Sequence, residues 1–69
     1  MVISYNKLWK LLIDKNMNKN TLRTNGVNAA TIAKMGKNEY VSMETLVRIC
    51  EILNCDIGDI VECIQDIKE

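Results

Sequence analysis

The side chains with the most distinctive chemistry are three cysteines, Cys50, Cys55 and Cys63. A structural zinc site takes four ligands drawn from Cys and His, and the chain has no His and no C-x-x-C pair. A cysteine nucleophile needs a neighbouring base, which is usually His. We therefore expect reduced thiols, with Cys50 in the core and Cys63 packed near the C-terminus, and neither a metal site nor enzymatic activity. A zinc site shared across a dimer is the alternative that three cysteines leave open.

The basic side chains are concentrated in the first half of the sequence. Residues 1–37 carry seven basic side chains and one acid, which gives +6, and residues 38–69 carry two basic side chains and eight acids, which gives −6. The two halves cancel, so the formal net charge of the chain is +0. This asymmetry favours a polyanion as the partner of the basic half. The alternative is that both sets of charges only solvate the surface.

The composition is typical of a small folded globule. The chain has 69 residues, of which 48% are hydrophobic and 26% are charged, and we expect one domain over residues 1–69. Its longest uninterrupted apolar runs, Met1–Ile3 and Leu11–Ile13, are far shorter than the roughly 20 residues that a membrane span needs. Because we find neither a span nor a signal peptide, we expect a cytoplasmic protein.

The spacing of the apolar residues predicts helices along most of the chain. Five helices are predicted, over residues 5–16, 19–24, 29–36, 43–53 and from 56 to about 61. The predicted N-caps are Ser4, Asn18 or Asn20, Asn28, Ser42 and Asp56. Trp9 and Tyr40 are expected to be packing residues.

The two ends of the chain are apolar, and their structure is ambiguous. Glu62–Ile67 either extends the fifth helix or alternates as a strand, and Met1–Ile3 is equally short. Two apolar ends of this kind can pair with each other or with a second chain.

The second and third predicted helices, with Gly26 in the turn between them, form a helix-turn-helix. The stretch NKNTLRTNGVNAATIAKMGKNE, preceded by YNKLWKLLIDKNM and followed by VSMETLVRICEILNCDIGDIVE, resembles the small lambda-repressor-like (Xre) helix-turn-helix regulators. The resemblance covers nearly the whole chain. It implies a compact, all-α, five-helix domain that binds double-stranded DNA and has no cofactor. One departure is that Leu22 and Gly26 lie four residues apart where five is common, and Asn25 stands where a small apolar residue is usual. We therefore expect a shortened second helix or turn.

The resemblance assigns roles to individual positions. Core positions of the motif are occupied by Val27, Ile32 and Met35. Base contacts are implied at Asn28, Ala29, Ala30, Thr31 and Lys34. Phosphate contacts are implied at Lys19, Asn20, Arg23, Lys37 and Asn38. Asn28 has the alternative role of a helix cap only, and Lys19 and Arg23 have that of solvated surface.

These observations predict sequence-specific DNA binding by a transcriptional regulator that acts as a repressor. A single small domain makes few base contacts, so we expect a homodimer, at least on DNA. Its candidate interfaces are Ile57–Ile67 and the apolar N-terminal tail, ahead of Met43 and Val47. No membrane or small-molecule partner is indicated. The alternative function is a protein-interaction or antitoxin-like accessory module that uses the acidic C-terminal half.

Overall fold

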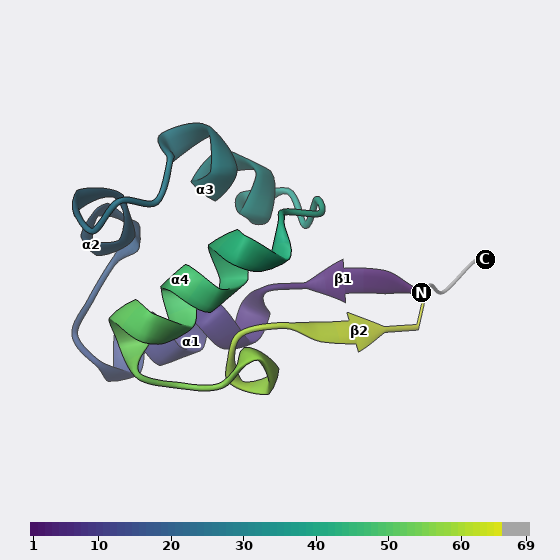
Figure 1. Cartoon of the computed structure of the whole chain (residues 1–69). Helices are drawn as coiled ribbons and strands as arrows, with labels where there is room; N and C mark the ends of the chain where they lie inside the picture. Colours follow the sequence, from purple (N-terminus) through teal and green to yellow (C-terminus); the bar gives the residue numbers. More distant parts are fainter. Residues whose placement is uncertain (66–69) are drawn as a thin grey trace.

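The computed structural model describes residues 1–65 as a body of four helices from which a two-stranded sheet projects (Figure 1). In chain order the elements are β1 (Val2–Ser4), α1 (Asn6–Asp14), α2 (Lys19–Thr24), α3 (Ala29–Gly36), α4 (Met43–Leu53), the 3-10 turn η1 (Ile57–Asp59) and β2 (Glu62–Ile64). The boundaries predicted for α2, α3 and α4 are confirmed, whereas α1 begins one residue later and ends two residues earlier than predicted.

Polar side chains fix where most of the helices begin. The side chains of Asn18, Asn28 and Ser42 each accept a hydrogen bond from a backbone N–H in the first turn of α2, α3 and α4. These three predicted N-caps are confirmed. The N-cap predicted at Ser4 is wrong, because Tyr5 occupies the cap position and makes no side-chain cap bond there. The hydroxyl of Ser4 still accepts a hydrogen bond from the second backbone N–H after it, at 3.3 Å.

Asparagines mark where three helices end. Asn16, Asn38 and Asn54 follow α1, α3 and α4, and each has a positive φ between 54° and 58°. Asparagine tolerates this left-handed conformation better than most residues with a side chain. The early end of α1 therefore has a local cause, namely the left-handed backbone at Asn16.

The core lies between the helices and includes residues from every helix. Its buried side chains are Tyr5, Leu8, Leu12, Leu22, Val27, Ile32, Met35, Leu46, Ile49, Leu53 and Ile60. The core positions predicted within the helix-turn-helix are thus confirmed. Trp9 and Cys50 are half-buried against this core, as expected. The packing role predicted for Tyr40 is wrong, because its side chain is 76% exposed. The packed position predicted for Cys63 is wrong too, because this thiol is exposed on β2.

The predicted fifth helix is replaced by a single 3-10 turn, so the all-α, five-helix prediction is wrong in this part. The capping box forms, since Asp56 N–H donates to Asp59 Oδ2 at 3.0 Å. After one turn, however, Ile60 enters the core completely and Glu62–Ile64 turns towards β1. Hydrogen bonds of the sheet thus replace those of a longer helix.

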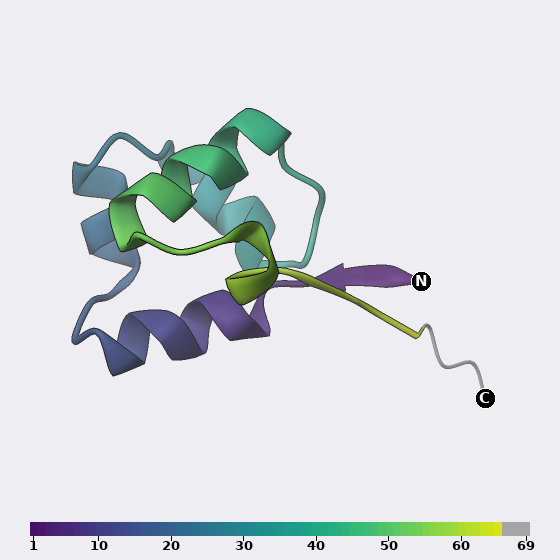
Figure 2. The same cartoon turned by 60° about the horizontal axis from the view of Figure 1, so that its bottom comes forward.

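The two ends of the chain pair with each other, one of the alternatives left open by the sequence. β1 and β2 form an antiparallel ladder in which Val2 lies opposite Ile64, Ile3 opposite Cys63 and Ser4 opposite Glu62. This two-stranded unit, residues 2–4 and 62–64, is called the arm below. Figure 2 shows it leaving the helical body on the side of the loop that follows α3. The last residues of the predicted tail, 66 and 67, lie outside the described residues.

Candidate nucleic-acid interface

The turn between α2 and α3 depends on one glycine and one buried valine. Gly26 has a φ of +102°, a conformation that side chains rarely allow. Val27 follows it, is 3% exposed and donates its N–H to Leu22 O at 3.0 Å. Asn25 donates from Nδ2 to Thr21 O at 2.7 Å. Asn25, a polar residue where a small apolar one is usual, therefore donates a hydrogen bond to a carbonyl near the end of α2.

One face of α3 is turned to solvent. Ile32 and Met35 are buried, so the opposite side of the helix must face outward. The exposed residues on that side follow i, i+3, i+4 and i+7 spacing: Ala30, Ala33, Lys34 and Lys37. They are called the outer face of α3 below. Ala33 was missed by the sequence analysis, although the helical period from Ala30 is a signal that could have found it.

The other predicted readout residues lie on the two flanks of the outer face. Ala29 borders a shallow hollow of about 180 Å³ that α2 also lines. Its small side chain leaves room between the two helices. Thr31 is half-buried on the opposite flank, in a hollow of about 230 Å³ towards α4. The structure thus brings three of the five predicted base-contact positions near the outer face and separates the other two, Asn28 and Thr31, towards α4.

Asn28 is engaged within the protein. Its Oδ1 accepts a hydrogen bond from Ala30 N–H at 2.7 Å, which caps α3. A bidentate pair with adenine needs both the amide oxygen and the amide nitrogen. With one lone pair of this oxygen occupied by the cap, Asn28 keeps its Nδ2 donors for a base or a phosphate.

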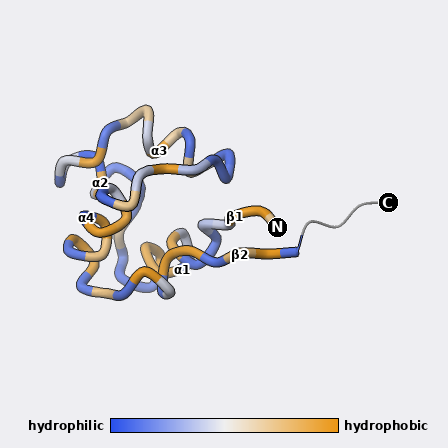
Figure 3. The backbone as a smooth tube through the Cα atoms, turned by 45° about the vertical axis from the view of Figure 1, so that its right-hand side comes forward, coloured by the Kyte–Doolittle hydropathy of each residue, from blue (hydrophilic) through white to orange (hydrophobic). Residues whose placement is uncertain are grey.

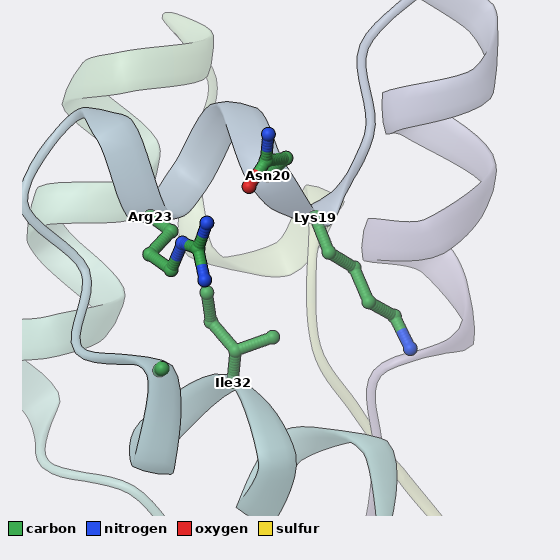
Figure 4. A pocket seen from close by; sticks show the side chains of 5 residues that line it. Lys19, Asn20, Arg23 and Ile32 are labelled. Carbon is green, nitrogen blue, oxygen red and sulfur yellow. The ribbon is translucent and has the colours of Figure 1, made fainter.

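The three predicted phosphate contacts on α2 point in different directions (Figure 4). Arg23 extends towards Ile32 of α3, and Asn20 lies beside it on the same hollow. Lys19 points away, with its Nζ 4.6 Å from the centre of the Trp9 ring. The same ammonium lies 3.9 Å from the position that a Cβ would take at Gly36. Lys19 therefore joins α2 to α1 and to the end of α3.

The loop after α3 is tied to the core by Tyr5. The backbone N–H of Tyr5 donates to Asn38 Oδ1 at 3.4 Å, and the Tyr5 hydroxyl donates to Glu39 O at 2.6 Å. Burial raises the pKa of the Tyr5 phenol above its usual value of 10.0, which keeps the hydroxyl a donor. The carbonyl of the Asn38 side chain thus faces inward, while the neighbouring Lys37 is exposed.

Arg48 on α4 lies against the helix-turn-helix, and it was not among the predicted site residues. Its Nη1 is 3.3 Å from the position that a Cβ would take at Gly26, and it lines the hollow beside Asn28 and Thr31. Glu44 lines the same hollow. The sequence carries no signal for this placement, because Arg48 belongs to the acidic half and to another helix.

Comparison with known proteins identifies the family. Residues 7–66 match the family model of the Cro/C1-type HTH DNA-binding domain. The chain belongs to this family. Among solved structures it is similar to one described as the crystal structure of transcriptional regulator VanUg, Form II, with 57% sequence identity and a TM-score of 0.89. That match covers 94% of this chain and 88% of the other. The comparison with curated proteins gives no match.

In this Cro/C1-type domain, the helix-turn-helix lies in a stretch of sequence that has no acidic residue. Between Asp14 and Glu39 the only charged side chains are Lys15, Lys19, Arg23, Lys34 and Lys37. Such a concentration of positive charge around two exposed helices attracts a polyanion and raises its rate of association.

Among residues 1–65, no helix combines the length and the apolar character that crossing a bilayer requires. In the same part of the chain, no three His, Cys, Asp or Glu side chains gather in an arrangement suited to a metal ion.

Proposed function

We propose that the chain is a transcriptional regulator that binds double-stranded DNA sequence-specifically through α2 and α3, and that it acts as a homodimeric repressor. The observation that carries this proposal is the outer face of α3, small and basic, presented by a Cro/C1-type fold. The description of the similar VanUg as a transcriptional regulator supports the same function.

In the proposed complex, α3 enters the major groove with its outer face towards the base pairs. The methyl groups of Ala30 and Ala33 suit contact with thymine methyls, and Lys34 suits donation to guanine O6 and N7. Ala29 and Thr31 would contact bases at the two edges of the helix, with Asn28 donating from Nδ2. Since three of these side chains are alanines, sequence-dependent DNA shape must supply part of the selectivity.

The phosphate contacts are proposed on both sides of α3. Arg23 and Asn20 would bind one strand, and Lys37 with Asn38 would bind the other. Lys19 would have to exchange its Trp9 contact for a phosphate, and an exposed contact of this kind is worth about 0.5–1 kcal/mol. We therefore expect Lys19 to contribute less to affinity than Arg23.

The test is a titration of fluorescently labelled duplex DNA, followed by anisotropy at several salt concentrations. The native chain is compared with Arg23→Ala and Lys34→Ala, each of which removes one exposed positive charge beside or on α3. Lys10→Ala is the matched control, because Lys10 lines a different hollow together with Asn54 and Asp59.

We expect affinity to fall steeply with salt, and loss of a phosphate contact at Arg23 to reduce the slope of log K against log salt by about 0.9. Lys34→Ala is expected to weaken binding and to relax selectivity at one base position. Lys10→Ala should bind nearly as well as the native chain. Absence of binding at low salt, or equal effects of all three substitutions, would contradict the proposed surface.

A further inference from the structure

We infer that Arg48 of α4 is a further DNA-binding residue, which contacts a backbone phosphate on the flank of α3 opposite Arg23. The inference rests on the proposed function, because it takes α3 to enter the major groove, and it adds a contact that lies outside the helix-turn-helix. Three properties of Arg48 support it: its position, the groups that line the hollow beside it, and its lack of a partner within the protein.

The helix α4 carries Arg48 to the start of α3. Figure 3 shows hydrophobic and hydrophilic positions alternating along α4, whose Leu46, Ile49 and Leu53 are buried in the core. Arg48 is exposed, and its Nη1 is 3.3 Å from the position that a Cβ would take at Gly26. Because glycine has no side chain, the guanidinium can lie across the turn between α2 and α3.

The hollow that Arg48 lines has groups suited to a phosphate oxygen. Its volume is about 230 Å³, and Asn28 and Thr31 line it as well. Asn28 keeps its Nδ2 donors, and Thr31 has a hydroxyl; neutral donors of both kinds contact phosphates in protein–DNA complexes. The planar guanidinium of an arginine matches two phosphate oxygens at once. The hollow thus combines one positive charge with neutral donors at the start of α3.

Glu44 is the acidic side chain on this hollow, one helical turn before Arg48. Opposite charges at this spacing on a helix can pair. Within residues 1–65, however, no ion pair or hydrogen bond joins Arg48 to Glu44 or to another side chain. The guanidinium is therefore available to an external anion, and the nearby carboxylate weakens the attraction of the hollow for that anion.

Arg23 and Arg48 lie on the two flanks of α3. Arg23 lines the hollow that includes Ala29, whereas Arg48 lines the hollow that includes Thr31. A helix in the major groove has a phosphate backbone on each side. One cation on each flank would therefore fix the position of α3 between the two backbones, with Lys34 facing the base pairs.

The test is a titration of fluorescently labelled duplex DNA, followed by anisotropy over a series of salt concentrations. Arg48→Met removes the charge and keeps an unbranched side chain that favours a helix. Lys10→Met is the matched control, since Lys10 is exposed on α1 and lines a different hollow. Arg23→Ala, measured alongside, reports on the proposed function independently. Circular dichroism verifies that each variant keeps its helices.

Arg48→Met should reduce the slope of log K against log salt by about 0.9, which lowers the affinity roughly eightfold at about 0.1 M salt. Lys10→Met should keep the native slope and affinity. Arg48→Lys keeps the charge without the planar fork, so we expect a native slope with a smaller loss of affinity. An arginine that only stabilised the turn would give a different result, namely weaker binding by Arg48→Met with no change of slope.

A second variant leaves Arg48 in place. Glu44→Gln removes the repulsion between its carboxylate and a phosphate and should raise the affinity about twofold at low salt. Asp14→Asn is its control, because it removes the same charge from α1, beside Lys10, and should bind as the native chain does. This comparison tests the inference even if Arg48→Met does not fold.

Two outcomes would overturn the inference: a native salt slope in Arg48→Met, or a Glu44→Gln chain that binds no more tightly than Asp14→Asn. If Arg23→Ala loses about 0.9 of the slope in the same experiment, the proposed DNA binding stands without Arg48. A native chain that binds no duplex DNA at low salt contradicts the proposed function, and the inference with it.

Discussion

Replacing Gly26 with alanine should destabilise the protein by about 1–2 kcal/mol. The φ of +102° at Gly26 lies in a region that residues with a side chain rarely adopt, and holding one there costs on the order of 1–3 kcal/mol. The added Cβ would lie 3.3 Å from Arg48 Nη1, which is the end of a flexible side chain and can move away. Alanine also restricts the unfolded chain, which offsets about 0.4–1 kcal/mol of the loss.

The assay is urea and thermal unfolding followed by circular dichroism, with the other two glycines as controls. At Gly36 a Cβ would make ordinary contact with Lys19 Nζ at 3.9 Å, and at Gly58 it would meet nothing within 4 Å. Neither position has a positive φ. Gly26→Ala should lower the Tm by roughly 4–8 °C per kcal/mol. Gly36→Ala, within α3, should leave stability unchanged or raise it by up to about 1 kcal/mol.

If Gly26→Ala and Gly58→Ala unfold at the same urea concentration, the predicted backbone strain at Gly26 is refuted. Equal midpoints would mean that the turn between α2 and α3 does not require a left-handed residue. A loss at Gly26 that disappears when Arg48 is also shortened to alanine would assign the effect to the side-chain contact rather than to the backbone.

Three further outcomes follow from the contacts and the raised pKa values. Tyr5→Phe removes the part-buried hydrogen bond to Glu39 O and should cost about 0.5–1.5 kcal/mol in unfolding free energy, the usual net contribution of one such bond; an unchanged urea midpoint would contradict this. An alkylating reagent should modify the exposed Cys63 first and Cys50 last, as followed by mass spectrometry, because burial and the neighbouring Cys55 raise the pKa of the Cys50 thiol to about 11. Folded Cys50 holds its proton more tightly than the unfolded chain does, because its pKa is raised. The free energy of unfolding should therefore keep its full value below pH 9.0 and decrease as the pH rises towards about 11. Urea midpoints that stay constant over that range would rule out this linkage.

Local sequence determined much of the helical part of the protein. Asn18, Asn28 and Ser42 cap their helices through bonds that span two or three residues, and such contacts can be read directly from the sequence. The burial of Ile32 and Met35 follows from the helical period, which also determines the outer face of α3. The site residues predicted on α3 came from the family resemblance, whereas the concentration of positive charge around them follows from the sequence alone.

Tertiary structure decided what depends on residues far apart in the chain. The capping box at Asp56 correctly predicted a helical turn, but the pairing of β2 with β1 ended that turn, because strand partners at opposite ends of the chain leave no local signal. The contact of Lys19 with Trp9 and the position of Arg48 over Gly26 have the same origin. Caps and helical periods extend over a few residues along the chain, whereas these contacts exist only after α1, α4 and the arm have packed around the helix-turn-helix.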